Sequence, residues 1–180
     1  NPTALHLDVA IPAAEAGCSL FFEKPVAESL ERIPNLLQAL QRGGGKAFTG
    51  FQFRFHPGLQ KVKALLAENA IGEVAAVQAH WGEYLPGWHP WEDYRQSYSA
   101  RKDLGGGVVL TLSHPLDYLR WLFGDAAEVG SMYRSIPSLG IDTEAAAQIH
   151  IRFQNEVIAN VHVNYIQRPA KHTLEVIGDL

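Results

Sequence analysis

Cysteine is almost absent from this sequence, because Cys18 is the only one in 180 residues. A single thiol can form neither an internal disulfide nor a thiolate metal cage. This excludes the disulfide-rich scaffolds of small secreted proteins and favours a reducing, cytoplasmic environment. No segment approaches ~18 uninterrupted apolar residues and no secretory leader is visible, so neither a membrane span nor secretion is expected.

Blocks of like charge are also missing. Fifteen Lys and Arg oppose nineteen Asp and Glu, which gives a net charge of -4 without a basic stretch. Nucleic acid and anionic membranes are therefore not expected as partners. Eight histidines are present, but no H-x3-H or H-E-x-x-H spacing occurs, so no metal site is predicted.

The composition is that of a folded protein. Hydrophobic residues make up 47% of the chain and charged residues 19%, which excludes a disordered protein. A folded chain of this length buries roughly 70% of its unfolded surface, enough for one or two domains. Because the chain opens on Asn1, has its only methionine at Met132 and ends at Leu180 within a strand pattern, we expect it to be a piece of a longer protein.

The first third alternates between helix and strand. A helix is predicted over residues 2–16, with Pro12 as a conflict inside it, and a short strand buried on both faces over residues 18–22. A second helix over 28–42 and a second strand over 46–53 follow. This order predicts a doubly wound parallel sheet.

The pattern changes after Phe55. Residues 57–69 are predicted as a helix, residues 73–85 as extended, and residues 106–122 as another helix. The segment 86–104 is long, irregular and rich in aromatic residues, which is typical of a functional loop.

The last third is rich in strands. Residues 148–153 and 156–165 alternate between apolar and polar side chains, and Asn155-Glu156 is the expected hairpin turn. An antiparallel sheet with one apolar and one polar face follows from this alternation. The polar face would carry Gln148, His150, Arg152, Asn160, His162 and Asn164.

Two short motifs carry candidate chemistry. Glu23-Lys24-Pro25 follows the first strand, where open α/β sheets bind ligands, although a solvated lysine is an equal alternative. His114 is placed in the middle of the helix 106–122, with Thr111 and Asp117 one turn away on the same face. The alternative for His114 is a structural hydrogen bond to Asp117. Pro115 weakens the helix and could free a carbonyl near the site.

Taken together, four segments resemble the Gfo/Idh/MocA family of NAD(P)-dependent oxidoreductases over essentially the whole chain. They are NPTALH at 1–6, FFEKPVA at 21–27, GFQFRFHP at 50–57, and GGG-x6-H-x2-D with WLFG at 105–124. The resemblance implies an α/β protein: residues 1–54 would be the C-terminal part of a doubly wound Rossmann domain. Residues 55–180 would form an α+β substrate-binding and oligomerisation domain with a large open, mostly antiparallel sheet, truncated at its C-terminus.

The resemblance also implies roles for individual residues. Asn1, Pro2 and His6 would line the nicotinamide end of the cofactor pocket, and Glu23, Lys24 and Pro25 resemble the family's EKP segment, whose lysine bridges nicotinamide and substrate hydroxyl and whose Lys-Pro bond is commonly cis. Arg54 would lie at the domain junction on the cofactor side. His114 resembles the catalytic histidine that takes the hydroxyl proton.

One position departs from the family pattern. Many relatives carry an Asp on the turn before the histidine, whereas this chain has Leu110 and Thr111 there. Thr111 can orient a hydroxyl but cannot hold a charge. Either Asp117 supplies the charge, or the reaction is weaker or altered.

The loop of residues 84–101 is the expected substrate-binding segment, because aromatic rings stack on sugars and basic groups bind hydroxyls, carboxylates or phosphates. A lid or dimer contact is the alternative. The expected substrate ligands are Tyr84, Trp88, His89, Tyr94 and Arg95.

The sequence therefore predicts an oxidoreductase that transfers a hydride between NAD or NADP and a sugar, cyclitol or sugar nucleotide. The alternatives are an NAD-dependent glycosidase of the same fold and a non-catalytic sensor or scaffold. No G-x-G-x-x-G follows a strand here, so NAD cannot be distinguished from NADP and the chain alone is expected to be inactive. A homodimer or homotetramer through the sheet of residues 144–178 is expected.

Overall fold

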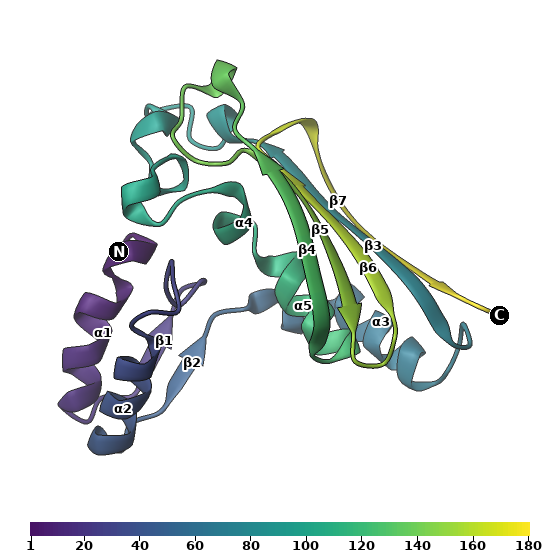
Figure 1. The fold of residues 1–180 in the computed structure, drawn as a ribbon, viewed down its shortest axis with the longest axis horizontal. Helices are drawn as coiled ribbons and strands as arrows, with labels where there is room; N and C mark the ends of the chain where they lie inside the picture. The colour runs from purple at the N-terminus through teal and green to yellow at the C-terminus, as the bar shows by residue number, and fades with distance from the viewer.

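The computed structural model describes residues 1–180 and shows two hydrophobic cores (Figure 1). The smaller core lies between the first helices and a two-stranded sheet. The larger core lies between a five-stranded sheet and the helices that pack on it, all from the rest of the chain. None of the helices combines the length and hydropathy that a bilayer crossing requires. The division at residues 54 and 55 stays a prediction.

The N-terminal part alternates between helix and strand as predicted. A 3-10 turn (Thr3–Leu5) leads into α1 (His6–Glu15), β1 (Leu20–Phe22), α2 (Ile33–Gly43) and β2 (Ala47–Thr49). The two strands pair in parallel, as expected for this order. Pro12 lies inside α1.

Three boundaries in this part differ from the prediction. The helix predicted from residue 28 begins at Ile33, because Pro34 is tolerated only in the first turn of a helix. The strand predicted over 46–53 ends at Thr49, after which the chain turns into a 3-10 helix, η2 (Gln52–Phe55). The prediction of a strand buried on both faces was wrong, because α1 and α2 cover one face only and Phe21 is 71% exposed.

The larger sheet has five strands in the order β4-β5-β6-β3-β7. All neighbouring strands are antiparallel except β3 and β6. The predicted large, mostly antiparallel sheet is thus confirmed. Its strands are β3 (Val74–Tyr84), β4 (Ala126–Arg134), β5 (Ala146–Phe153), β6 (Ile158–Asn164) and β7 (Ile166–Gly178).

Helices cover one face of this sheet (Figure 1). They are α3 (Pro57–Ala67), α4 (Val108–Thr111) and α5 (His114–Phe123). The alternation predicted for β5 and β6 is confirmed, since Ile149, Val161 and Val163 are buried against these helices. The hairpin turn also forms where expected, with Glu156 in the left-handed region at φ 64°.

The helix predicted over 106–122 is broken into two. α4 ends at Thr111, and α5 begins at His114 after a two-residue break. In a continuous helix the ring of Pro115 would clash with the carbonyl of Thr111, four residues earlier, so Pro115 takes a first-turn position in a new helix. His114 is therefore the first residue of α5, not a residue in the middle of a helix.

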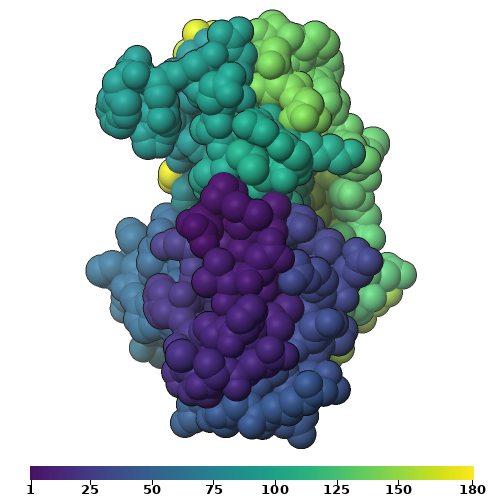
Figure 2. All heavy atoms as spheres, turned by 90° about the vertical axis from the view of Figure 1, so that its left-hand side faces the viewer, coloured from purple at the N-terminus to yellow at the C-terminus, as the bar shows by residue number.

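The predicted irregular segment is confirmed as four short 3-10 turns joined by loops. They are η3 (Leu85–Gly87), η4 (Tyr94–Gln96), η5 (Tyr98–Ala100) and η6 (Lys102–Leu104), and a further turn, η7 (Pro137–Leu139), follows β4. η6 lies against the first 3-10 turn of the chain. Figure 2 shows the first residues, in purple, packed under this teal segment.

Candidate active site

Lys24 lies at the junction of the two parts of the chain. It follows the carboxyl end of β1, and the Lys24–Pro25 peptide bond is cis, as the resemblance implied. Its Nζ donates a hydrogen bond to the backbone carbonyl of Thr111, 87 positions further along the chain. That carbonyl is free because Pro115 has no N–H with which to close the helical bond. The expected free carbonyl near the site is therefore present, and it holds Lys24.

His114 is buried in a cage of aromatic rings. Its ring centroid lies 4.7 Å from that of Phe53, 5.4 Å from that of Trp81 and 6.2 Å from that of Phe51. Its Nδ1 is buried without a hydrogen-bond partner. Burial, together with the charges of Lys24 and His172, lowers the pKa of His114 to about 4. At neutral pH the imidazole is therefore uncharged and can accept a proton.

The ammonium of Lys24 shares this environment. Partial burial lowers its pKa, whereas the negative charges of Glu23 and Glu83 act in the opposite direction. Glu23 is exposed beside Lys24, and one of its oxygens accepts the backbone N–H of Lys24 at 3.3 Å. The site thus holds the Lys24 ammonium, which donates hydrogen bonds, and the uncharged imidazole of His114.

Asp117 makes a different contact from the one predicted. Because the helix breaks before His114, Thr111 does not share a helical face with His114 and Asp117, and no hydrogen bond joins His114 to Asp117. Instead Asp117 accepts two hydrogen bonds from Arg54, at 2.9 Å from Nε and 2.5 Å from Nη2. This pair ties η2 to the first turn of α5, and it raises the pKa of Arg54. The alternative of a structural His114–Asp117 bond was therefore wrong.

Thr111 contributes its carbonyl to Lys24, and its hydroxyl lies within hydrogen-bond reach of the Tyr165 hydroxyl. Ser113 Oγ and His114 Nδ1, two and three residues later, are buried without a partner in the chain. Buried polar atoms without a partner are uncommon in folded proteins. These two atoms on one short segment indicate a place where an external polar group binds.

The residues expected around the nicotinamide come together at the N-terminal end of α1. Nδ1 of His6 lies 3.0 Å from the carbonyl oxygen of Pro25, and Nε2 of His6 lies 3.1 Å from the carbonyl oxygen of Asn1. Pro2 immediately precedes the first turn. A concavity of about 300 Å³ beside β1 is lined by Asn1, His6 and Glu23 together with six apolar residues. The role of Asn1, His6 and Glu23 beside the nicotinamide stays a prediction.

The residues expected to bind substrate do not converge on His114. Trp88 packs edge-on against Tyr165 at 5.6 Å, and the Tyr94 hydroxyl donates to the carbonyl of Leu139. Arg95 pairs with Asp93 at the surface. These contacts account for packing and surface charge, and no hydrogen bond links these residues to Lys24 or His114.

The other two expected substrate residues are also engaged elsewhere. The Tyr84 ring lies under the guanidinium of Arg168 at 4.0 Å, and His89 is exposed beside Trp91. The role of the loop of residues 84–101 in substrate binding stays a prediction.

Sequence reasoning missed three residues that lie in contact with one another near His114. They are Trp81 and Glu83 on β3 and His172 on β7. Trp81 and Glu83 are two apart, so alternation along β3 places them on one face. His172 joins them only because the register sets it opposite Trp81.

The chain thus combines a two-stranded parallel sheet with an open five-stranded mixed sheet, and a lysine and a histidine lie at their junction. Two family models match the chain: "Oxidoreductase family, NAD-binding Rossmann fold" over residues 1–51, and "GFO/IDH/MocA C-terminal domain" over residues 59–180. The chain belongs to the GFO/IDH/MocA family.

Curated relatives of known name include oxidoreductases of sugars. The chain is 27% identical to an uncharacterized oxidoreductase of Synechocystis over 99% of its own length and 51% of the relative. It is 28% identical to 1,5-anhydro-D-fructose reductase of Ensifer adhaerens, over 97% of this chain and 51% of that protein. The chain thus spans about half the length of these relatives.

Solved structures share the fold. The WlbA dehydrogenase of Bordetella pertussis, in complex with NADH and UDP-GlcNAcA, aligns with a TM-score of 0.89 at 23% identity, over 99% of this chain and 51% of that one. Levoglucosan dehydrogenase, in complex with NADH and levoglucosan, aligns with a TM-score of 0.86 at 24% identity, over 99% of this chain and 50% of that one.

Proposed function

We propose that the protein containing this chain is an oxidoreductase that transfers a hydride between NAD or NADP and a hydroxyl-bearing carbon of a sugar, cyclitol or sugar nucleotide. One observation carries the proposal. The tertiary fold holds the Lys24 ammonium on the Thr111 carbonyl, three residues from the buried, uncharged imidazole of His114. A donor and a base at one junction are what the oxidation of an alcohol requires.

His114 acts as the base in this proposal. When the substrate alcohol is oxidised, the C–H bond breaks with its electron pair, and the hydroxyl proton moves to the imidazole, leaving a carbonyl. Bound NAD(P)+ supplies the hydride acceptor. The reverse reaction returns the proton from imidazolium to the new hydroxyl.

Lys24 polarises the reacting oxygen. Its ammonium already donates to a neutral carbonyl, and a substrate oxygen would offer a second acceptor for the same three-donor group. Lys24 would also touch the nicotinamide end of the cofactor, together with Asn1, Pro2, His6, Glu23 and Pro25. The Thr111 hydroxyl would orient the substrate.

The names of the relatives support the substrate class. Levoglucosan dehydrogenase and 1,5-anhydro-D-fructose reductase are named for sugar derivatives, and WlbA is bound to a sugar nucleotide. A shared architecture does not select one substrate, so the proposal stops at the class.

The test is turnover by the full-length protein. Reduction of NAD+ and of NADP+ is followed by absorbance with a panel of sugars, cyclitols and uridine diphosphate sugars, and products are identified by mass spectrometry. We expect one cofactor and a subset of the panel to give a ketone or aldehyde. Release of a phenol from aryl glycosides would identify a glycosidase instead, and a protein that binds sugar without any conversion would be a sensor.

A further inference from the structure

The edge strand β4 lacks the features that usually keep a strand from pairing further. It lies at one end of the five-stranded sheet, pairs only with β5, and is exposed along its whole length (Figure 1). Lysine and proline commonly protect such edges. The strand at the other edge, β7, contains Arg168, Pro169 and Lys171, whereas β4 contains neither lysine nor proline. The free backbone N–H and C=O groups of β4 can therefore accept another strand.

The side chains of β4 are apolar for a strand that faces water. Val129, Met132 and Tyr133 are between 64% and 73% exposed. Val129, Ser131 and Tyr133 point to the helix-covered side, where they line an apolar concavity of about 370 Å³ with residues of β5, α4 and α5. Alternation along the strand places Gly130 and Met132 on the opposite side. Apolar surface of this kind marks a protein contact.

The residue order of β4 is complementary to its own reverse. In an antiparallel pair of two β4 strands with a twofold axis at Ser131, residues equally distant from Ser131 on either side face each other. The resulting pairs are Glu128 with the partner's Arg134, Val129 with the partner's Tyr133, and Gly130 with the partner's Met132. Each pair occurs twice, so one strand supplies both halves of every contact.

The charged pair joins groups that are free to bind. Arg134 forms no ion pair within its own chain, and its only side-chain hydrogen bond runs from Nε to a backbone carbonyl at 3.4 Å. Glu128 uses Oε2 to pair with Arg152 at 3.2 Å, and its Oε1 accepts no hydrogen bond. Opposite charges directly across two strands stabilise the pairing.

The two uncharged pairs fit by size and shape. A Cβ added at Gly130 would find no atom within 4 Å, so open space lies there for the partner's Met132 side chain. Val129 and the partner's Tyr133 form a pair of a β-branched and an aromatic residue, which is among the favourable cross-strand combinations. All three kinds of contact thus agree on one register.

We propose that β4 is a subunit contact, in which two copies of this chain pair their β4 strands antiparallel about Ser131 and continue the sheet from one copy into the other. The contact uses residues 126–134, outside the range 144–178 through which the sequence predicts association. It does not depend on the proposed function.

A cysteine on the twofold axis tests the register. The two Ser131 Cβ atoms would lie about 4.5–5.5 Å apart, close to the separation that a disulfide spans. We expect the full-length protein with Ser131→Cys, in a Cys18→Ser background, to form a covalent dimer on mild oxidation, with the linked peptides containing position 131. Arg134→Cys is the matched control, because the two thiols would be roughly 20 Å apart and should not link.

A charge exchange tests the ion pairs. Arg134→Glu places two acids opposite each other on both sides of the axis and should raise the dissociation constant, measured by sedimentation, by about five- to thirtyfold. Adding Glu128→Arg restores the pairs in reverse and should bring the constant back to within about threefold. Arg42→Glu, at the exposed end of α2, makes the same charge change away from β4 and should have no effect.

Three results would overturn the proposal. One is a folded Ser131→Cys variant that forms no covalent dimer, and another is equal linking of the Arg134→Cys variant. The third is protection of the β4 amides from hydrogen exchange that does not change on dilution. That result would show that a segment outside residues 1–180 occupies the edge.

Rescue by the double variant separates pairing from folding. A role of Arg134 in folding alone would lower the melting temperature of Arg134→Glu, and Glu128→Arg would not reverse that loss. Equal dissociation constants for the single variant, the double variant and the unsubstituted protein would also contradict the pairing.

Discussion

Individual side chains at the junction owe their properties to what surrounds them. His114 is an ordinary histidine by sequence, but 5% exposure, aromatic neighbours and the nearby cation make it a base that stays neutral. The Thr111 carbonyl is free to accept a hydrogen bond from Lys24 because Pro115, four residues later, has no N–H to donate to it. Pro115 therefore makes the contact between Lys24 and Thr111 possible.

Removing the base should suppress turnover. We expect His114→Asn to lower kcat of the full-length protein by roughly 10² to 10⁴-fold with cofactor affinity nearly intact, the usual contribution of a positioned general base. Lys24→Met should be at least as severe, and Thr111→Ala less so. His56→Asn is the control, because asparagine can still cap α3. Normal turnover with a lowered melting temperature would remove His114 from the assignment.

The depressed pKa of His114 predicts how stability depends on pH. The unfolded chain binds a proton at its histidine near pH 6.5, whereas the folded chain does so only near 4. Stability is therefore full above 6.5 and falls as the pH drops towards 4, by about 2 kcal/mol at pH 5 for this residue. His80 and His162, whose pKa values burial also lowers, add to the same trend.

Urea unfolding at pH 7 and pH 5 measures this effect. Replacing His114 by asparagine removes its share, so the loss between the two pH values should be smaller in the variant than in the unsubstituted chain. An equal loss in both proteins would show that His114 does not carry the effect.

Among the elements, the break between α4 and α5 organises the site. Gly107 precedes α4 at a φ of 110°, and the carboxylate of Glu144 accepts the N–H of Val109 at 3.0 Å in the first turn. A Cβ at Gly107 would collide with that carboxylate. Gly107 and Glu144 therefore fix the start of α4, the four-residue helix whose last carbonyl, that of Thr111, binds Lys24.

Gly107→Ala should therefore destabilise the fold. A non-glycine residue at this φ costs about 1–3 kcal/mol before the displaced Glu144 is counted. Gly130→Ala on β4 is the control, since an added Cβ there has no neighbour within 4 Å, and its effect should stay within about 0.5 kcal/mol. Urea unfolding of both variants provides the comparison. Equal stabilities would contradict the argument.

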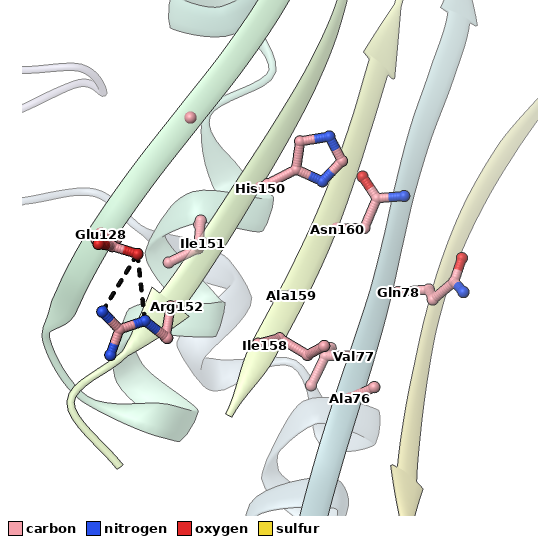
Figure 3. Close-up of a pocket in the computed structure, with 11 residues that line it drawn as sticks. Ala76, Val77, Gln78, Glu128, His150, Ile151, Arg152, Ile158, Ala159 and Asn160 are labelled. Carbon is pink, nitrogen blue, oxygen red and sulfur yellow. Dashed lines mark hydrogen bonds and ion pairs between the residues drawn. The ribbon is translucent and has the colours of Figure 1, made fainter. Parts of the chain in front are cut away.

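For the molecule as a whole, the face of the large sheet that no helix covers carries a row of polar side chains. Figure 3 shows His150, Asn160 and Gln78 in a row across β5, β6 and β3, with Arg152 paired to Glu128 beside them. They line an open concavity of about 460 Å³. Asn160 Oδ1 is buried without a partner, as are Gln148 Oε1 and His162 Nδ1. Buried polar atoms without a partner suit a hydrated interface between subunits better than a surface exposed to bulk water.

We expect the full-length protein to self-associate through this face of residues 144–178, as a dimer or tetramer. His150→Glu places a second acid near Glu128 and should shift the mass measured by light scattering towards the monomer. Lys61→Glu on the exposed side of α3 is the control. A strictly monomeric mass of the unsubstituted protein at high concentration would contradict the prediction.

The isolated chain of 180 residues should bind dinucleotide poorly. Pyrophosphate is held by a glycine-rich turn and the helix N-terminus behind it, and no G-x-G-x-x-G follows a strand here. Calorimetry with NAD and NADP on this chain checks the expectation. Micromolar affinity would show that its own residues capture the cofactor.

Features with a local physical cause could be predicted from the amino-acid sequence alone. The alternation of β5 and β6, the hairpin between them and the helix α3 were placed correctly because side-chain periodicity follows from backbone geometry within one element. Lys24 and His114 were singled out by resemblance. The carbonyl freed by Pro115 was expected on steric grounds.

Features that depend on neighbours distant in sequence could not be predicted in the same way. The edge strand β4 is exposed along its whole length, so no buried side marks it. The Arg54–Asp117 pair and the Glu83–His172 contact each join elements whose separation and register are set by packing. A charge finds its partner only when the folded chain has brought the two together, because electrostatic contact depends on distance in space and not along the sequence.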